Sequence, residues 1–261
     1  MTPPSLDSLA AELFDSRVSG RAVAPLTARG FELSVEDAYA IQQINTDRRL
    51  AEGRRLVGWK IGLTSAAMQA QLGVDAPDSG VLLDDMLLPD GAVVSRAGLI
   101  SPRIEAEIAV IFDSDVAGPG LGPDDVGKRV AAVVPALEII DSRIADWKIA
   151  LADTVADNAS SALAVAGEPL PGIAADTLKD ETVELLVDGQ PVTGGSGQAL
   201  LGDPLRALAW LANRLGPLGL AIPAGVLVLA GSVHAAVPLE LGHEYTARYT
   251  RAGSVSVRVG P

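Results

Sequence analysis

The N-terminal part of the chain repeats apolar positions at the spacing of a helix. Residues 5–53 contain two such stripes, separated by the Gly-Phe-Glu-Leu-Ser stretch at 30–34. Their positions are Leu6, Leu9, Ala10 and Leu13, and, continuing from Asp37, Ala38, Ile41, Ile44 and Asn45. This spacing predicts two helices, because residues three and four apart share one helix face.

From Val57 onward the apolar segments are short and broken by Gly, Pro and Asp, which favours strands joined by turns. Residues 117–125 are predicted to form a loop, and the glycines at 189–197 a hairpin after a strand at Val183–Val187. The stretch 189–202 lacks a Gly-Lys-Ser/Thr ending and is not a phosphate-binding loop. Further elements are a helix opened by Asp203-Pro204, with Leu205, Leu208, Ala209 and Leu211 on one stripe, and closing strands at Val226–Ala230 and Ser254–Val259.

These patterns predict an α+β fold. We expect a helical N-terminal portion over residues 1–75 and a strand-rich core over 76–261. Because no long polar linker separates the two parts, one continuous domain is an equally acceptable arrangement.

Three glutamates stand inside apolar segments. Glu105 and Glu107 lie two residues apart in a predicted strand and therefore share one face, because strand side chains alternate. Glu138 lies in a second apolar stretch, Val133–Ile140. Carboxylates are rarely buried without a partner or a cation, so the set suggests a hard divalent ion. The alternative is that the glutamates are solvated on an open sheet face.

Composition excludes several other kinds of site. The 261 residues include no cysteine, which excludes disulfides, thiolate metal sites and cysteine nucleophiles, and only two histidines, His234 and His243. The net charge of −13 argues against nucleic acid or an anionic membrane as partner. No apolar run approaches the roughly 18 residues of a membrane span, and the N-terminus lacks the pattern of a signal peptide. We therefore expect a cytoplasmic protein.

Five ordered segments resemble the 2-hydroxypenta-2,4-dienoate (2-keto-4-pentenoate) hydratase and 4-oxalocrotonate decarboxylase family, a branch of the fumarylacetoacetate-hydrolase-like superfamily. They are Gly58-Trp59-Lys60-Ile61-Gly62-Leu63-Thr64-Ser65, Pro77-Asp78-Ser79-Gly80, Pro102-Arg103-Ile104-Glu105-Ala106-Glu107, Pro135-Ala136-Leu137-Glu138-Ile139-Ile140-Asp141-Ser142-Arg143 and Ala156-Asp157-Asn158-Ala159-Ser160-Ser161. The similarity runs from about residue 20 to the C-terminus. It implies a mixed β-roll core, which agrees with the strand-rich pattern.

The resemblance also implies roles for individual residues. Glu105, Glu107 and Glu138 would bind Mg²⁺ or Mn²⁺. Lys60 would lie beside the 2-oxo acid as a cationic donor or acid/base, and Asp78 would share the acid/base work. Ser160 and Ser232 would bind substrate. Ordinary alternatives remain: a surface lysine at 60, a turn at Pro77-Asp78-Ser79-Gly80, and a helix cap at residues 157–161.

Two further features belong to the resemblance. Asp141 and Arg143 are predicted to form an ion pair that braces the Glu138 strand. Where the family has an acid after glycine at two C-terminal positions, this chain has Val226 and His243, which puts substrate preference near that segment in question.

The resemblance implies a metal-dependent hydratase of 2-hydroxypenta-2,4-dienoate in the meta-cleavage catabolism of aromatic compounds, with 4-hydroxy-2-oxopentanoate as product. The neighbourhoods of Arg103 and Trp147, together with Pro77-Asp78, look closer to the hydratase branch. One alternative is decarboxylation of a 2-oxo-dioate such as 4-oxalocrotonate; the other is a non-catalytic partner subunit. We also expect a homo-oligomer, with pairing to a related decarboxylase or aldolase as a further possibility.

Overall fold

The computed structural model describes residues 4–65, 69, 74 and 76–261. The helices of these residues are α1 (Leu6–Ser19), α2 (Val35–Ala51), α4 (Pro123–Gly127), α5 (Leu151–Ala156) and α6 (Pro204–Leu215). Short 3₁₀ segments are η1 (Ala145–Trp147), η2 (Asn158–Ser160), η3 (Ala175–Asp180), η4 (Gly197–Ala199) and η5 (Gly216–Leu218). None of the described helices is long and apolar enough to cross a membrane.

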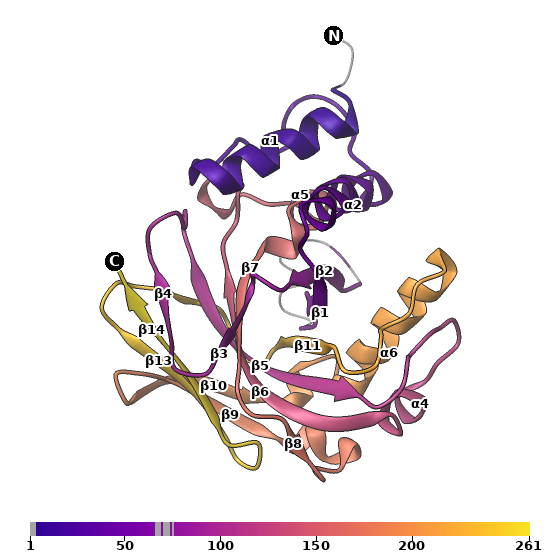
Figure 1. The fold of residues 1–261 in the computed structure, drawn as a ribbon, viewed down its shortest axis with the longest axis vertical. Helices are drawn as coiled ribbons and strands as arrows, with labels where there is room; N and C mark the ends of the chain where they lie inside the picture. The colour runs from indigo at the N-terminus through magenta and orange to yellow at the C-terminus, as the bar shows by residue number, and fades with distance from the viewer. Residues whose placement is uncertain (1–3, 66–68, 70–73, 75) are drawn as a thin grey trace.

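A mixed sheet of nine strands, counted over the described residues, forms the centre of the molecule. Its order is β2 (Asp78–Leu83), β1 (Leu56–Gly62), β11 (Leu227–Ser232), β5 (Arg103–Phe112), β6 (Val130–Ile140), β7 (Ser161–Ala166) and β3 (Leu87–Pro89), with β12 (Val237–Pro238) beside β5 and β8 (Leu170–Pro171) beside β6. The sheet curls into a half-barrel (Figure 1).

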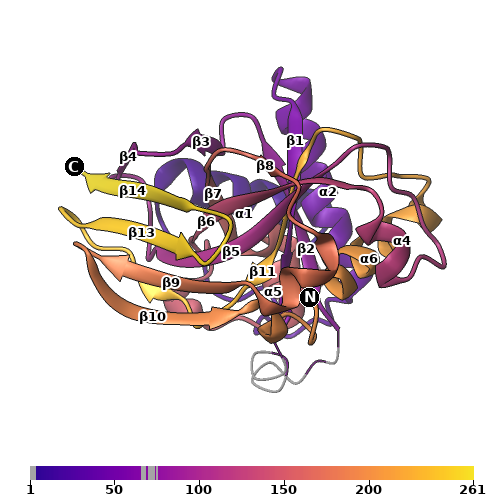
Figure 2. The ribbon, with the colours of Figure 1, turned by 90° about the horizontal axis from the view of Figure 1, so that it is seen from below.

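A second sheet packs against one side of the first. Its order is β10 (Gln190–Ser196), β9 (Thr182–Val187), β13 (Glu244–Tyr249), β14 (Ser254–Gly260) and β4 (Ala92–Ser95). Figure 2 shows four of these strands, β10, β9, β13 and β14, side by side. The main hydrophobic core fills the space between the two sheets and the apolar face of α6, with Ile108, Leu208 and Val257 among its buried members.

The helices α1, α2 and α5 gather at one end of the molecule (Figure 1). They enclose a separate core that contains Leu9, Leu13, Ile41 and Val155. The amide of Gln42 links this helical layer to the large sheet, because it donates to the carbonyls of Ser79 in β2 (3.0 Å) and Val155 in α5 (2.8 Å).

The predicted α+β class with a helical N-terminal portion is confirmed. The predicted boundary at residue 75 lies outside the described residues and stays a prediction. β1, which precedes that boundary, is a strand of the large sheet between β2 and β11.

Several predicted elements have ends that differ from the prediction by one or more residues. The second helix begins at Val35, not Asp37, because the side chain of Ser34 caps it by accepting the Asp37 N–H (3.0 Å). The loop predicted over 117–125 gives way to α4 at Pro123, where proline is favourable in a first turn. The strand predicted from Val226 begins at Leu227. The helix capped by Asp203 and the hairpin of β9 and β10 are confirmed.

Candidate active site

Three carboxylates converge on one face of the large sheet. Glu105 in β5 pairs directly with Glu138 in β6, and Glu107 lies two residues farther along β5. One oxygen from each lies within 4.8 Å of the others. Glu107 and Glu138 are buried and Glu105 is partly exposed. The expectation that Glu105 and Glu107 share a face therefore holds, and the alternative of solvated glutamates does not hold for the two buried ones.

The cluster fits a divalent cation. Both oxygens of Glu138 are buried and accept no hydrogen bond among the described residues. Glu107 receives one, from the backbone N–H of Gly231 to Oε2 (2.8 Å). Leaving buried carboxylate oxygens unsatisfied is costly, and hard oxygen ligands suit Mg²⁺ or Mn²⁺. A cation held by the three glutamates would satisfy these atoms.

The carboxylates also raise one another's proton affinity. Burial, and next the charge of Glu138, raise the pKa of Glu105 to about 7. The same two causes raise the pKa of Glu107 well above its ordinary value. In the absence of a cation, this cluster therefore retains protons at a pH where solvated glutamates are ionised.

Lys60 in β1 is buried and reaches the carboxylate cluster. Its Nζ lies 3.3 Å from Glu138 Oε2 and donates to the carbonyl of Ala159 (3.0 Å). Burial lowers the pKa of Lys60, but the nearby carboxylates, Glu138 first, outweigh it and leave the pKa above its ordinary value. The surface-lysine alternative is therefore wrong, and the side chain is a charged donor inside the site.

Asp78 begins β2 and lies opposite Gly62 of β1. A Cβ at residue 62 would stand 2.2 Å from Asp78 Oδ1, so only glycine allows this carboxyl to occupy its place. Burial raises the pKa of Asp78 despite the opposing charge of Lys60. The sheet thus places Asp78 beside Lys60, in a strand and not in the turn that the sequence also allowed.

Ser160 lies in a strained turn between α5 and β7. Asn158, Ala159 and Ser160 have φ values of 55°, 50° and 55°, a left-handed conformation that costs non-glycine residues roughly 1–2 kcal/mol each. The Ser160 hydroxyl is buried and lies 3.2 Å from Thr154 Oγ1. Asp157 ends α5 as its C-cap and precedes η2, but its side chain makes no capping hydrogen bond to η2, so the side-chain helix cap of the ordinary alternative is not formed.

Ser232 lies opposite Glu107 in the pairing of β11 with β5. Its hydroxyl donates to the carbonyl of His234 (2.7 Å), and this bond fixes the start of the following loop. Ser232 therefore lies beside the carboxylate cluster, while its substrate role stays a prediction.

Neither histidine can serve in a Ser-His-Asp triad. His234 Nε2 accepts the Ala106 N–H (3.1 Å) and Nδ1 is 2.8 Å from the carbonyl of Ala235, which fixes the neutral ring with its proton on Nδ1. Burial lowers the pKa of His234 further. His243 pairs with Asp188 on the surface (2.7 Å). The ring of His234 thus supports the backbone between Glu105 and Glu107.

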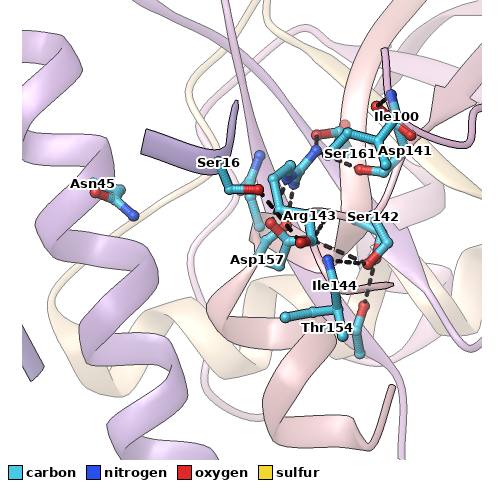
Figure 3. Close-up of polar contacts among 12 residues, drawn as sticks. Ser16, Asn45, Ile100, Asp141, Ser142, Arg143, Ile144, Thr154, Asp157 and Ser161 are labelled. Atoms are coloured by element: carbon cyan, nitrogen blue, oxygen red, sulfur yellow. Dashed lines mark hydrogen bonds and ion pairs between the residues drawn. The ribbon is translucent and has the colours of Figure 1, made fainter. Parts of the chain in front are cut away.

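The predicted ion pair of Asp141 with Arg143 is wrong. Arg143 pairs with the carboxylate of Asp157, and Figure 3 shows its guanidinium between Asp157 and Ser161. The Asp141 carboxylate accepts the N–H groups of Ile100 (2.8 Å) and Ser101 (2.7 Å). The physical reason is that the backbone N–H groups of Ile100 and Ser101 occupy the Asp141 carboxylate, so Arg143 pairs with Asp157 instead.

Comparison with known proteins agrees with this geometry. The family model of the fumarylacetoacetate (FAA) hydrolase C-terminal region matches residues 60–260. The chain belongs to the fumarylacetoacetate hydrolase family. The matched range contains every carboxylate of the cluster, Lys60 and the strained turn.

Similar members of the family cover nearly the whole chain. A 2-keto-4-pentenoate hydratase of Paraburkholderia xenovorans (strain LB400) is 43% identical over 98% of this chain and 95% of its own. A 2-hydroxyhexa-2,4-dienoate hydratase of Comamonas testosteroni is 42% identical over 94% of each. The solved structure of 4-oxalocrotonate decarboxylase from Pseudomonas putida G7, complexed with magnesium and adipate, superposes with a TM-score of 0.94 at 38% identity, covering 99% of this chain and 98% of that one. The predicted resemblance to the hydratase and decarboxylase branch is confirmed.

Several groups at the site were not found from the sequence. Two are backbone atoms, the Gly231 N–H on Glu107 and the Ala159 carbonyl on Lys60. Backbone groups carry no residue signature. A third is Asn158, whose side chain bonds the N–H (2.8 Å) and carbonyl (3.0 Å) of Val81. Asparagine tolerates left-handed backbone better than most residues, so Asp157-Asn158 was a usable signal for the turn.

Proposed function

We propose that this protein is a divalent-metal-dependent hydratase. It adds water to 2-hydroxypenta-2,4-dienoate (2-oxopent-4-enoate) and gives 4-hydroxy-2-oxopentanoate, in the catabolism of aromatic compounds. The observation that carries the proposal is the buried cluster of Glu105, Glu107 and Glu138 with the Lys60 ammonium beside it. The hydratases similar over nearly the whole chain support the choice of reaction.

In this proposal Glu105, Glu107 and Glu138 hold Mg²⁺ or Mn²⁺. The bound cation supplies a Lewis acid for the keto oxygen and carboxylate of a 2-oxo acid. Three carboxylates exceed the charge of a dication by about one unit, so an anionic substrate needs additional donors. Lys60, whose raised pKa keeps it charged, supplies such a donor 3.3 Å from Glu138 Oε2. The hydroxyls of Ser160 and Ser232 are proposed to bind the substrate carboxylate.

The reaction adds a proton to carbon twice, and the enol and the attacking water each lose one. Protonation of the dienol at C5, with loss of the enol proton, gives an α,β-unsaturated ketone, and water then adds with its oxygen at C4 and a proton at C3. Asp78 suits these transfers, because burial raises its pKa above that of a solvated carboxyl and one of its oxygens has no hydrogen-bond partner among the described residues. Lys60 is then the positioning cation, and Asp78 the acid and base.

One alternative function has a specific observation in its favour. The 4-oxalocrotonate decarboxylase structure covers 99% of this chain at 38% identity. Decarboxylation of a 2-oxo-dioate uses the same stabilisation of an enolate, so the carboxylate cluster fits both reactions. The difference lies in what surrounds the distal end of the substrate: a positioned water for hydration, or room for a second carboxylate.

One experiment distinguishes hydration from decarboxylation. Purified protein with Mg²⁺ is incubated with freshly generated 2-hydroxypenta-2,4-dienoate and, in a separate reaction, with 4-oxalocrotonate. Absorbance and NMR follow the products. We expect loss of the dienol, a new hydroxyl at C4 and no carbon dioxide. Release of carbon dioxide from the dioate without hydration of the dienol would overturn the assignment and favour the decarboxylase.

The remaining features of the proposal concern the setting of the enzyme. We propose a cytoplasmic homo-oligomer, with pairing to a related decarboxylase or aldolase as a further proposal; size-exclusion chromatography with light scattering tests the first. A non-catalytic subunit is disfavoured, because such a role does not require a buried lysine beside unsatisfied carboxylate oxygens.

A further inference from the structure

A buried network ties the end of α5 to the segment that follows β6, the strand of Glu138. Arg143 donates to the Asp157 carboxylate through Nε and through its backbone N–H (2.9 Å), and to the Asp157 carbonyl through Nη2. Its remaining Nη1 donates to the carbonyls of Asp141 and Ser161, the latter at 3.2 Å. Figure 3 shows this guanidinium enclosed by its partners. Three of these five bonds end on Asp157 and one on Ser161, the two residues that flank the strained turn.

The network encloses both ends of that turn. Asp157 precedes Asn158, Ala159 and Ser160, and Ser161 follows them. The Asp157 carbonyl accepts the Ser160 N–H (3.0 Å), so the same residue also closes the turn. Consecutive left-handed residues persist only where the surroundings over-determine them. Arg143 and Asp157 supply that constraint from one side.

The sheet supplies the constraint from the other side. The side chain of Asn158 bonds both backbone groups of Val81, and a Cβ at Gly80 would lie 2.5 Å from the Asn158 carbonyl oxygen. The turn is thus pressed against β2, next to Asp78. The outcome is that the Ala159 carbonyl faces inward, 3.0 Å from Lys60 Nζ.

We propose that Arg143 and Asp157 are positioning residues that act through this turn. By holding residues 158–160 left-handed, they direct the Ala159 carbonyl at Lys60 and place the Lys60 ammonium beside Glu138. This role rests on the proposed function, in which Lys60 is the cation that orients the substrate. Arg143 and Asp157 themselves touch neither the carboxylate cluster nor Lys60.

A nearby residue provides a matched control. Asp153 lies inside α5, just before Asp157, and is also a buried aspartate, but its carboxylate accepts the N–H groups of Leu26 (2.7 Å) and Thr27 (3.1 Å), in the helical layer. Asp153→Asn therefore removes a buried carboxylate of similar burial without altering the turn. A purely structural role of Asp157 predicts the same outcome for both substitutions.

The first measurement is steady-state kinetics at a temperature where each variant is folded. Asp157→Asn and Arg143→Lys should lower kcat on the order of 10- to 100-fold, the scale of a misplaced catalytic group, with little change in Mg²⁺ affinity. Asp153→Asn should lower thermal stability and leave kcat within about twofold of wild type. A wild-type kcat in folded Arg143→Lys and Asp157→Asn would overturn the proposal.

The second measurement does not depend on activity. The sequence has four lysines, of which Lys128, Lys148 and Lys179 are exposed. An NMR spectrum of protein labelled with [¹³Cε]lysine therefore contains few signals, and the signal that is lost in Lys60→Ala is that of Lys60. We expect Asp157→Asn or, if that variant does not fold, Arg143→Lys to shift this signal, and Asp153→Asn to leave it in place. An unmoved Lys60 signal, or an equal shift in the control, would overturn the role. If wild type hydrates no dienoate, the proposed function fails, and this spectrum still decides whether the network positions Lys60.

Discussion

At the scale of single residues, the site is governed by the balance between burial and charge at Lys60. Burial alone favours a neutral amine, but the carboxylates of Glu138, Asp78, Glu107 and Glu105 all favour the ammonium. Because four carboxyls outnumber one lysine, the cluster has excess negative charge once a metal ion has displaced the protons that burial leaves on it. The Lys60 ammonium is therefore a permanent positive charge of the site. A bound divalent cation would neutralise the carboxylate charge that Lys60 leaves unpaired.

The Lys60→Ala variant tests this role. We expect turnover to fall by about 10²- to 10⁴-fold, the usual contribution of a general acid–base or positioning group, because the substrate loses its nearby cation. The affinity for Mg²⁺ should not fall, because the removed group is itself positive. Kinetics and calorimetric metal titration measure the two quantities. The exposed Lys179→Ala variant is the control, and wild-type turnover in Lys60→Ala would contradict the role.

Protonation of the cluster predicts a pH dependence. Burial and the charge of Glu138 raise the pKa of Glu105 from 4.5 to about 7 in the folded, metal-free chain. A carboxyl with a raised folded pKa contributes stability below its unfolded pKa, and this contribution is lost as the pH rises from about 4.5 to about 7. A metal ion must displace the same protons.

We therefore expect Mg²⁺ to raise the melting temperature more at pH 8 than at pH 6, and metal binding at pH 6 to release protons. Calorimetry in two buffers with different ionisation enthalpies counts the protons released. Metal binding at pH 6 without proton release would show that the glutamates are already ionised and that the assigned pKa is wrong.

The sequence could predict the residue-level features that neighbouring residues determine. It could not predict those that depend on the pairing of segments far apart in the chain. Glu105 and Glu107 share a face because of strand periodicity alone, which is local. That Glu138 stands directly opposite Glu105 depends on the register of β5 with β6, which no local pattern fixes. The choice of Asp157 over Asp141 as partner of Arg143 depends on where α5 ends relative to the sheet, and this prediction failed for that reason.

At the scale of elements, one tyrosine joins the two sheets beneath the carboxylate cluster. Tyr249 of β13 accepts the N–H of Ala136 in β6 (3.1 Å) and donates to the carbonyl of Glu107 in β5 (2.6 Å). Tyr245, four residues earlier in the same strand, bonds a different pair of backbone groups, the Glu240 N–H (2.8 Å) and the Pro238 carbonyl (2.9 Å). Each hydroxyl accepts one backbone N–H and donates to one carbonyl. Only the Tyr249 hydroxyl bonds β5 and β6, the two strands that carry the three glutamates.

We expect Tyr249→Phe and Tyr245→Phe each to lower the free energy of unfolding by about 1–3 kcal/mol, because each leaves a backbone donor without its partner. Only Tyr249→Phe should also weaken metal binding, since it frees the Glu107 backbone. Denaturant unfolding and metal titration measure the two effects. Equal metal affinity in both variants would show that the small sheet does not support the cluster.

The elements themselves were predictable where capping and periodicity agree. Asp203 with Pro204 marks the start of α6, and the glycines after β9 mark the hairpin. Within the left-handed turn at 158–160 only Asn158 carries a local signal, because the conformation of Ala159 and Ser160 opposes local preference and is imposed by the Arg143–Asp157 network and by β2. Such a conflict between local preference and tertiary structure is typical of a functional position.

At the scale of the whole molecule, the main core and the core of the helical layer lie in different parts of the structure from the carboxylate cluster. A helical layer with its own core holds α5, the two sheets enclose the main core, and the site lies on the large sheet below the helices. The strand pairing that creates the site spans β1, β5, β6 and β11, from residue 56 to residue 232. The carboxylate cluster therefore exists only once these distant strands have paired.

The most direct test of the account counts bound metal against activity. Mn²⁺ is titrated into metal-free protein, and the bound fraction is measured by electron paramagnetic resonance. Hydration of 2-hydroxypenta-2,4-dienoate is followed in the same samples. The variant Glu107→Gln and the exposed control Glu184→Gln are measured in parallel. We predict that activity rises in proportion to bound Mn²⁺ and saturates near one ion per chain in wild type and Glu184→Gln, while folded Glu107→Gln binds weakly and stays inactive. Full hydratase activity in thoroughly metal-free protein, or undiminished metal binding and activity in Glu107→Gln, would contradict the account.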